Sequence, residues 1–148
     1  MRAGVTLARM SETRTEGACL CGRVRYRIVG EILGFQYCHC SRCRRFTGSA
    51  HAANLFVRPD DLEWLAGGED VGSYMLEGEP NFPTGFCRTC GSSMPSLSST
   101  GRYWVVPAGA LETDPGERPA RNIFWGSRAP WLVETSDLPR HDEMPEKA

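Results

Sequence analysis

The chain has 148 residues, a length that fits one domain with a modest hydrophobic core. Hydrophobic residues make up 41% of it and charged residues 24%, which argues against full-length disorder, a collagen-like chain or a coiled coil. The formal net charge is −1, so the chain as a whole has no field that would draw it to nucleic acid or to an anionic membrane.

Residues 1–16 are polar and lack periodicity, so we expect a disordered leader, within which Met10 is a second candidate start of translation. They contain no apolar core of a secretory signal, and no stretch of the chain approaches the roughly 20 apolar residues of a membrane helix. These features predict a cytoplasmic protein without membrane contact, in which cysteines stay reduced.

Residues 17–139 read as a single, mainly β domain, because short extended segments alternate with glycine and proline turns. The strongest strand signal is the alternation of Arg23, Arg25 and Arg27 with Val24, Tyr26 and Ile28, which predicts an apolar face on the core and an arginine face outward. Further strands are expected at 52–57, 72–76, 103–106 and 122–125, and the only helix candidate is one turn at 60–65. The charged residues 140–148 are expected to form a flexible tail.

All seven cysteines fall into three clusters, Cys19-Leu20-Cys21, Cys38-His39-Cys40-Ser41-Arg42-Cys43 and Cys87-Arg88-Thr89-Cys90. Their odd number argues against a framework of disulfides. Thiolates at such short spacings reach a common ion, and tetrahedral zinc is the usual occupant of all-sulfur sites. The sequence therefore predicts zinc, with two ions per chain.

A glycine follows the last cysteine of the first and third clusters, at Gly22 and Gly91, where it permits a left-handed turn that brings backbone N–H groups toward sulfur. This shared pattern pairs the two clusters into one closed site. We expect that site to hold a structural zinc that ties distant parts of the chain together. Its ligands would be Cys19, Cys21, Cys87 and Cys90.

The middle cluster offers a second zinc only Cys38, Cys40 and Cys43. Three protein ligands with an exchangeable fourth are typical of catalytic zinc, whose fourth position takes water or substrate. His39 lies between two ligands, so its side chain is expected to point away. Whether His51 or water completes the site stays open, and we favour His51 as a hydrogen-bonded polar residue. No residue stands out as the general acid or base.

Two zinc–thiolate sites together carry a charge of about −3, so nearby cations are expected. Arginines flank the clusters at positions 42, 44, 45 and 88. They could neutralise the sulfur charge, or they could clamp the carboxylates of an anionic ligand at the open zinc.

The three motifs, from Gly17 to Gly22, from Cys38 to Ser49 and from Phe86 to Gly91, together resemble the glutathione-dependent formaldehyde-activating enzyme family, which includes centromere protein V-like domains. Segments 106–111, 121–125 and 129–131 are also similar to that family. The resemblance implies a β-tent fold of antiparallel sheets joined at zinc. It also implies a structural ion at the first and third clusters and a second zinc at the middle one.

The implied activity is that of a carbon–sulfur lyase, which reversibly forms S-(hydroxymethyl)glutathione from glutathione and formaldehyde. Its partner would be a small-molecule thiol such as glutathione. Two alternatives are a non-catalytic zinc-binding interaction module, with the arginine face against nucleic acid or protein, and thiol redox switching at the middle cluster. No nucleic acid is expected, and the sequence does not specify the oligomeric state.

Overall fold

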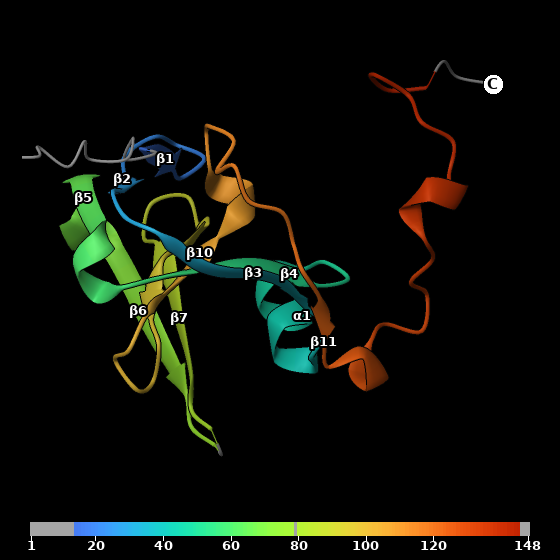
Figure 1. Cartoon of the computed structure of the whole chain (residues 1–148), viewed down its shortest axis with the longest axis horizontal. Helices are drawn as coiled ribbons and strands as arrows, with labels where there is room; N and C mark the ends of the chain where they lie inside the picture. Colours follow the sequence, from blue (N-terminus) through green and yellow to red (C-terminus); the bar gives the residue numbers. More distant parts are fainter. Residues whose placement is uncertain (1–13, 79, 146–148) are drawn as a thin grey trace, which may run out of the picture.

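Three small β-sheets and one α-helix make up the fold of residues 14–78 and 80–145, the part of the chain that the computed structural model describes (Figure 1). The strands are β1 (Thr15–Ala18), β2 (Arg25–Ile28), β3 (Ile32–Cys38), β4 (Ala52–Val57), β5 (Leu62–Ala66), β6 (Val71–Leu76), β7 (Phe82–Cys87), β8 (Ser93–Met94), β9 (Ser96–Leu97), β10 (Trp104–Pro107) and β11 (Asn122–Ile123). The helix is α1 (Ser41–Thr47). Single 3-10 turns cover Pro59–Asp61, Gly68–Asp70, Ala108–Ala110, Trp125–Ser127 and Thr135–Asp137. Among the described helices, none has the length and apolar character to span a membrane.

The first sheet has the antiparallel order β1-β2-β5. Val24, Tyr26 and Ile28 are fully buried, while the arginines between them face outward, so the predicted alternation is confirmed. β1 begins at Thr15, and this side chain is buried. The last two residues of the expected leader, 15 and 16, therefore belong to the sheet, and residues 1–13 lie outside the described part.

The second sheet has the order β11-β3-β4-β10-β9 and is antiparallel except at one edge. There β11 joins β3 in parallel, with Asn122 opposite Tyr37 and Ile123 opposite Cys38. This pairing brings a segment more than 80 residues downstream beside the middle cysteine cluster. The third sheet, β6-β7-β8, carries Cys87 at the end of its central strand.

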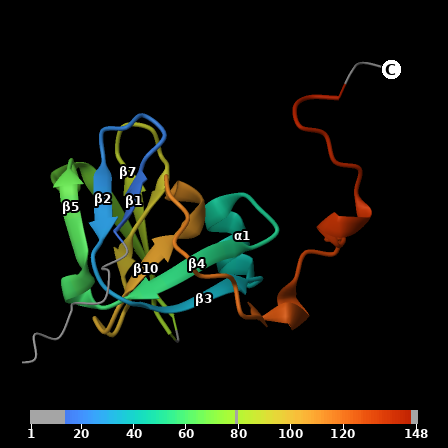
Figure 2. The same cartoon turned by 45° about the horizontal axis from the view of Figure 1, so that its top comes forward.

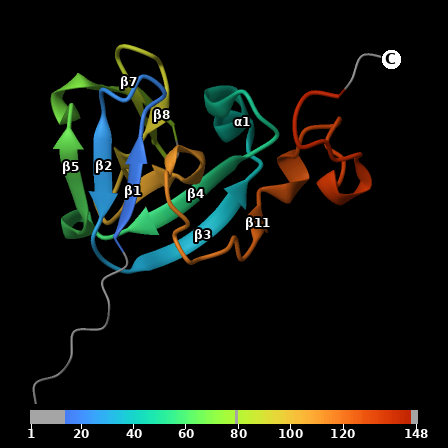
Figure 3. The same cartoon turned by 90° about the horizontal axis from the view of Figure 1, so that it is seen from above.

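The main hydrophobic core takes its buried side chains from all three sheets, whose strands lie close together in Figure 2. Its largest fully buried side chains include Tyr26, Ile28, Leu55, Met94 and Val106. A smaller cluster contains the three cysteines of the middle motif and Ala52, with Phe82 and Ile123 packed against it. The second cluster lies at the edge where β3, α1 and β11 meet, as seen from above in Figure 3.

The expected helical turn at 60–65 is only partly correct. A 3-10 turn covers Pro59–Asp61, but Leu62 is buried and begins β5, which pairs with β2. Pairing with a preformed sheet edge overrides the weak local preference there. α1 was not among the expected elements, because its seven residues are too few for a helical stripe.

The last described residues, 128–145, lead away from the sheets (Figure 1). Their backbone hydrogen bonds join close neighbours, as from Leu132 N–H to Ala129 C=O and from Leu138 N–H to Thr135 C=O. Residues 140–145 of the expected tail are exposed, and 146–148 lie outside the described part.

Candidate metal centres and the adjoining cavity

The first and third cysteine clusters come together as one group of four. Cys19 and Cys21 lie in the turn between β1 and β2, whereas Cys87 ends β7 and Cys90 lies in the turn that follows it. The four sulfur atoms are within 4.8 Å of one another, and those of Cys21 and Cys87 are 3.9 Å apart. The structure therefore brings together the four residues that the glycine pattern paired.

Two left-handed glycines and one serine shape this group. Gly22 and Gly91 have φ angles of 76° and 77°, as the predicted turns require. Val24 N–H donates to Cys19 Sγ at 3.2 Å, so a backbone donor does point at sulfur. Ser92, which the sequence analysis missed, accepts from Leu20 N–H at 2.9 Å and contacts Cys90 Sγ at 3.2 Å. Its hydroxyl lowers the pKa of Cys90 to about 5.

The middle cluster forms a separate group of three buried thiols. Cys38 ends β3, Cys40 is the N-cap of α1 and Cys43 lies in the first turn of the helix. Their sulfurs also lie within 4.8 Å of one another. Cys40 Sγ accepts from Cys43 N–H at 3.4 Å, so the cap itself places two of the three sulfurs. The hydrogen bond between the Cys43 and Cys38 side chains lowers the pKa of Cys38 to about 6.

Both groups fit a metal ion by the chemistry of their donors. Four thiols complete the tetrahedral set that zinc prefers, whereas three thiols leave one position for another ligand. Neither His39 nor His51 belongs to the three-cysteine group, and within the described ranges no carboxylate joins it. The two cysteine groups could therefore hold metal ions, and zinc is consistent with their sulfur donors.

The two histidines near the middle cluster have different surroundings. His39 is 2% exposed; its Nε2 is 2.9 Å from Asn122 Oδ1 and its ring meets Trp125 edge-on, so it points away from the three sulfurs as expected. His51 stacks on Tyr37 with ring centroids 4.2 Å apart. Its Nδ1 is buried without a hydrogen-bond partner among the described residues. Burial lowers the pKa of His51.

A cavity of about 880 Å³ adjoins the three-cysteine group. Residues of α1, β4, β7 and β10 line it, and Cys38, Cys40, Cys43 and His51 are in its wall. Arg42 lines it too, with Nη1 donating to Pro80 C=O at 3.1 Å and the guanidinium 5.1 Å above the Phe82 ring. A volume of this size accommodates an organic ligand beside the open side of the thiol group.

The flanking arginines separate into different environments. Arg42 reaches the cavity, Arg44 and Arg45 lie on the same helix, and Arg88 is exposed beside the four-cysteine group. Among them Arg42 is therefore placed to meet an anionic ligand in the cavity.

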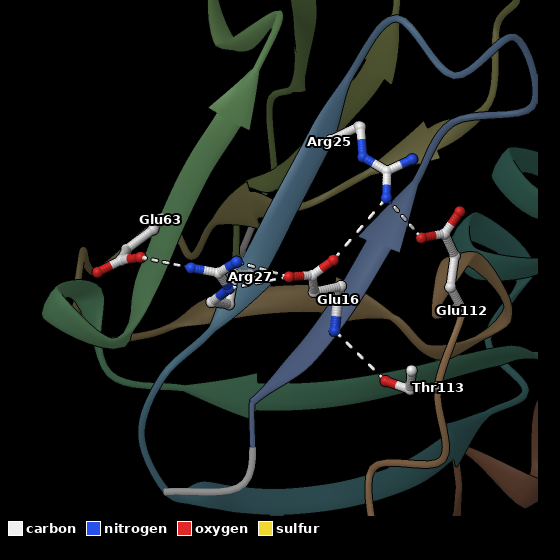
Figure 4. A network of polar contacts seen from close by, with 6 residues as sticks. All are labelled: Glu16, Arg25, Arg27, Glu63, Glu112 and Thr113. Atoms are coloured by element: carbon white, nitrogen blue, oxygen red, sulfur yellow. Dashed lines mark hydrogen bonds and ion pairs between the residues drawn. The ribbon is translucent and has the colours of Figure 1, made fainter.

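The outward arginine face of β2 is occupied by ion pairs (Figure 4). Arg25 Nη2 is 2.8 Å from Glu112 Oε2, and Arg27 Nη2 is 2.6 Å from Glu16 Oε1. Glu63 approaches Arg27 at 4.0 Å. These carboxylates neutralise the face that the interaction-module hypothesis would use for nucleic acid.

Comparison with known proteins places this geometry in a family. Residues 14–127 match the family model described as glutathione-dependent formaldehyde-activating enzyme. A Halomonas elongata protein, provisionally named as such an enzyme, is 33% identical over 133 residues, which cover 84% of each chain. A crystal structure of a Rhodobacter sphaeroides protein superimposes with a TM-score of 0.55 at 31% identity, covering 70% of this chain and 97% of that one. The chain therefore belongs to the glutathione-dependent formaldehyde-activating enzyme family.

Proposed function

We propose that the chain is a zinc-dependent carbon–sulfur lyase that forms and cleaves S-(hydroxymethyl)glutathione, or a similar thiol adduct, at the three-cysteine group. One observation carries the proposal: three buried thiols, with no fourth ligand side chain in the described ranges, line a cavity of about 880 Å³. A metal position that keeps one site for an outside ligand is typical of catalytic rather than structural zinc. Family membership supports glutathione and formaldehyde as the reactants.

In this proposal each cysteine group has its own role. Cys38, Cys40 and Cys43 hold the second zinc, and the four-cysteine group holds the structural one. The three small sheets, with cysteine groups at their turns and edges, support the β-tent fold that the family resemblance implies.

The reaction joins a thiol to a carbonyl carbon. A C–S bond forms, the C=O bond becomes C–OH, and the thiol proton ends on the carbonyl oxygen; cleavage is the reverse. A zinc ion bound by the three cysteines would lower the pKa of a thiol that completes its coordination, which supplies a nucleophile near neutral pH. Phe82 and Ile123 pack against the cysteines and give the cavity an apolar wall beside them.

Two cavity residues are placed to assist. His51 lines the cavity, and burial lowers the pKa of its imidazole, which favours the neutral form that is able to accept a proton. The Arg42 guanidinium presents donors to a carboxylate of glutathione. In this proposal Arg42 holds the substrate, and His51 accepts its proton, beside the three-cysteine group.

The test combines metal analysis with cobalt spectroscopy. We expect two zinc ions per chain in anaerobically purified protein, and a saturable change of the thiolate-to-cobalt band when glutathione is added to the cobalt-substituted protein. The control variant Cys40→Ser should retain one ion and show no response to glutathione. A wild-type cobalt spectrum indifferent to glutathione would contradict the proposal.

A further inference from the structure

Three phenylalanines from separate elements line the cavity that adjoins the three-cysteine group. Phe46 comes from α1, Phe82 begins β7 and Phe124 follows β11, and all three line the cavity. Phe82 also packs directly against the cysteines. We call Phe46, Phe82 and Phe124 the phenylalanine rim.

The rim exposes apolar surface that the fold does not require. The Phe124 side chain is 56% exposed and that of Phe46 is 36% exposed. Phe124 also has a φ of 52°, and it is the only non-glycine residue in the described part with a positive φ. A bulky residue in this region is strained, and such strain is retained mainly where a site uses it. The exposed, strained ring is therefore better explained by a ligand than by stability.

Formaldehyde and glutathione do not account for this rim. Formaldehyde is scarcely larger than water, whose share of liquid volume is about 30 Å³. Glutathione is polar over most of its surface, with two carboxylates, an ammonium and two amides. Neither molecule presents an apolar group that would cover three phenyl rings, although the cavity, at about 880 Å³, has room for one.

We infer that the carbonyl substrate is an aldehyde bearing an apolar group about the size of a benzene ring, which packs against the phenylalanine rim. The inference rests on the proposed function and specifies its substrate class. The step is the same redox-neutral addition: the thiol sulfur bonds to the aldehyde carbon, and the thiol proton ends on the aldehyde oxygen. The product is a glutathione hemithioacetal whose apolar group lies among the rings.

Two stable thioethers test the rim without requiring turnover. We would titrate the zinc-loaded full chain with S-benzylglutathione and with S-methylglutathione in a calorimeter. The benzyl compound should bind about tenfold more tightly, because its ring is transferred from water to the apolar surface of the rim.

The variants remove rings with little effect on the backbone. Phe46→Ala retains a good helix former, and Phe124→Asn retains a residue that tolerates the left-handed region. Each variant should bring the two affinities to within about threefold of each other, chiefly by weakening the binding of S-benzylglutathione. The control Tyr74→Ala removes a 60% exposed ring of β6 outside the cavity and should preserve the tenfold difference.

A parallel assay tests the proposed lyase function separately from the inferred apolar aldehyde substrate. Exchange NMR measures the rate at which glutathione adds to formaldehyde and to benzaldehyde in the presence of the protein. Accelerated formaldehyde exchange, with equal affinity for the two thioethers in the wild type, would overturn the substrate class and leave the proposed function standing. No acceleration with either aldehyde would overturn the proposed function and this inference with it.

Discussion

Cys40 combines two roles at the three-cysteine group, since its sulfur is a candidate metal ligand and also caps α1. We predict that Cys40→Ser retains the fold, because serine is a preferred N-cap, but loses the second metal, because a hydroxyl is a poor zinc ligand. The melting temperature should fall by less than about 4 °C, the zinc content should drop to one per chain, and formaldehyde exchange should be lost. Thermal unfolding followed by circular dichroism, together with elemental analysis, measures these quantities. A variant that fails to fold would instead make the second site structural.

Gly17 is the clearest case of a residue fixed by packing. It lies opposite Tyr26 in the pairing of β1 with β2, and a Cβ at this position would collide with the buried Tyr26 ring. We predict that Gly17→Ala lowers the free energy of unfolding by about 1–3 kcal/mol, as overpacking of a core does. Gly34→Ala is the matched control, because its Cβ would meet Phe56 at an ordinary 3.6 Å. Urea denaturation of the two variants should separate them; equal losses would show that the Tyr26 ring moves aside freely.

At the scale of elements, the Glu16–Arg27 pair links β1 to β2 on the solvent side of the first sheet (Figure 4). The hydrogen bond from Arg27 lowers the pKa of Glu16 below its ordinary value of about 4.3. Because the folded-state pKa is the lower one, this stabilisation is fully present above the unfolded-state pKa and is lost as the pH falls through the folded-state value.

We therefore predict that Glu16→Gln melts at a lower temperature than the wild type at neutral pH. The difference should stay constant down to about pH 5 and shrink as the pH falls further. Melting temperatures of both proteins between pH 7 and the acid limit of folding measure it. A difference that persists unchanged in acid would mean that the carboxylate charge contributes nothing.

The elements also show where sequence patterns suffice and where they do not. β2 was predictable because apolar residues and arginines alternate along it, and this alternation follows which side chains are buried. The predicted bounds of β4 also agree with the observed ones. α1 was not, because it spans two turns and is held by the Cys40 cap and the left-handed Gly48 rather than by an apolar stripe. The local signals for this helix are Cys40, which serves as N-cap as well as candidate ligand, and Gly48, which ends the helix. Together they could have predicted α1.

The same contrast holds for the site. The pairing of four cysteines followed from glycines next to them in sequence. Asn122 and Phe124 were not identified as site residues, because they reach the middle cluster only through the parallel pairing of β11 with β3. Such a contact depends on the topology of the whole sheet and leaves no local signal.

For the molecule as a whole, a metal ion bound at one cysteine group should stabilise something different from an ion bound at the other. The four-cysteine group joins turns 66 residues apart, between Cys21 and Cys87, whereas the three-cysteine group spans only residues 38–43. On the scale of a covalent crosslink, closing the longer loop contributes about 4 kcal/mol, and closing the shorter one constrains little. Three ligands also hold an ion less tightly than four.

Stepwise removal of zinc with increasing chelator should therefore occur in two stages. The first equivalent should leave with loss of formaldehyde exchange and with the circular dichroism spectrum unchanged. The second should leave together with cooperative unfolding, because an ion that joins the distant turns of the four-cysteine group would be coupled to folding. Zinc release measured with a metal-sensitive dye, alongside circular dichroism, follows both stages in one titration. Unfolding on loss of the first equivalent would place the weaker-held ion in the four-cysteine group and reverse the assignment of the two sites.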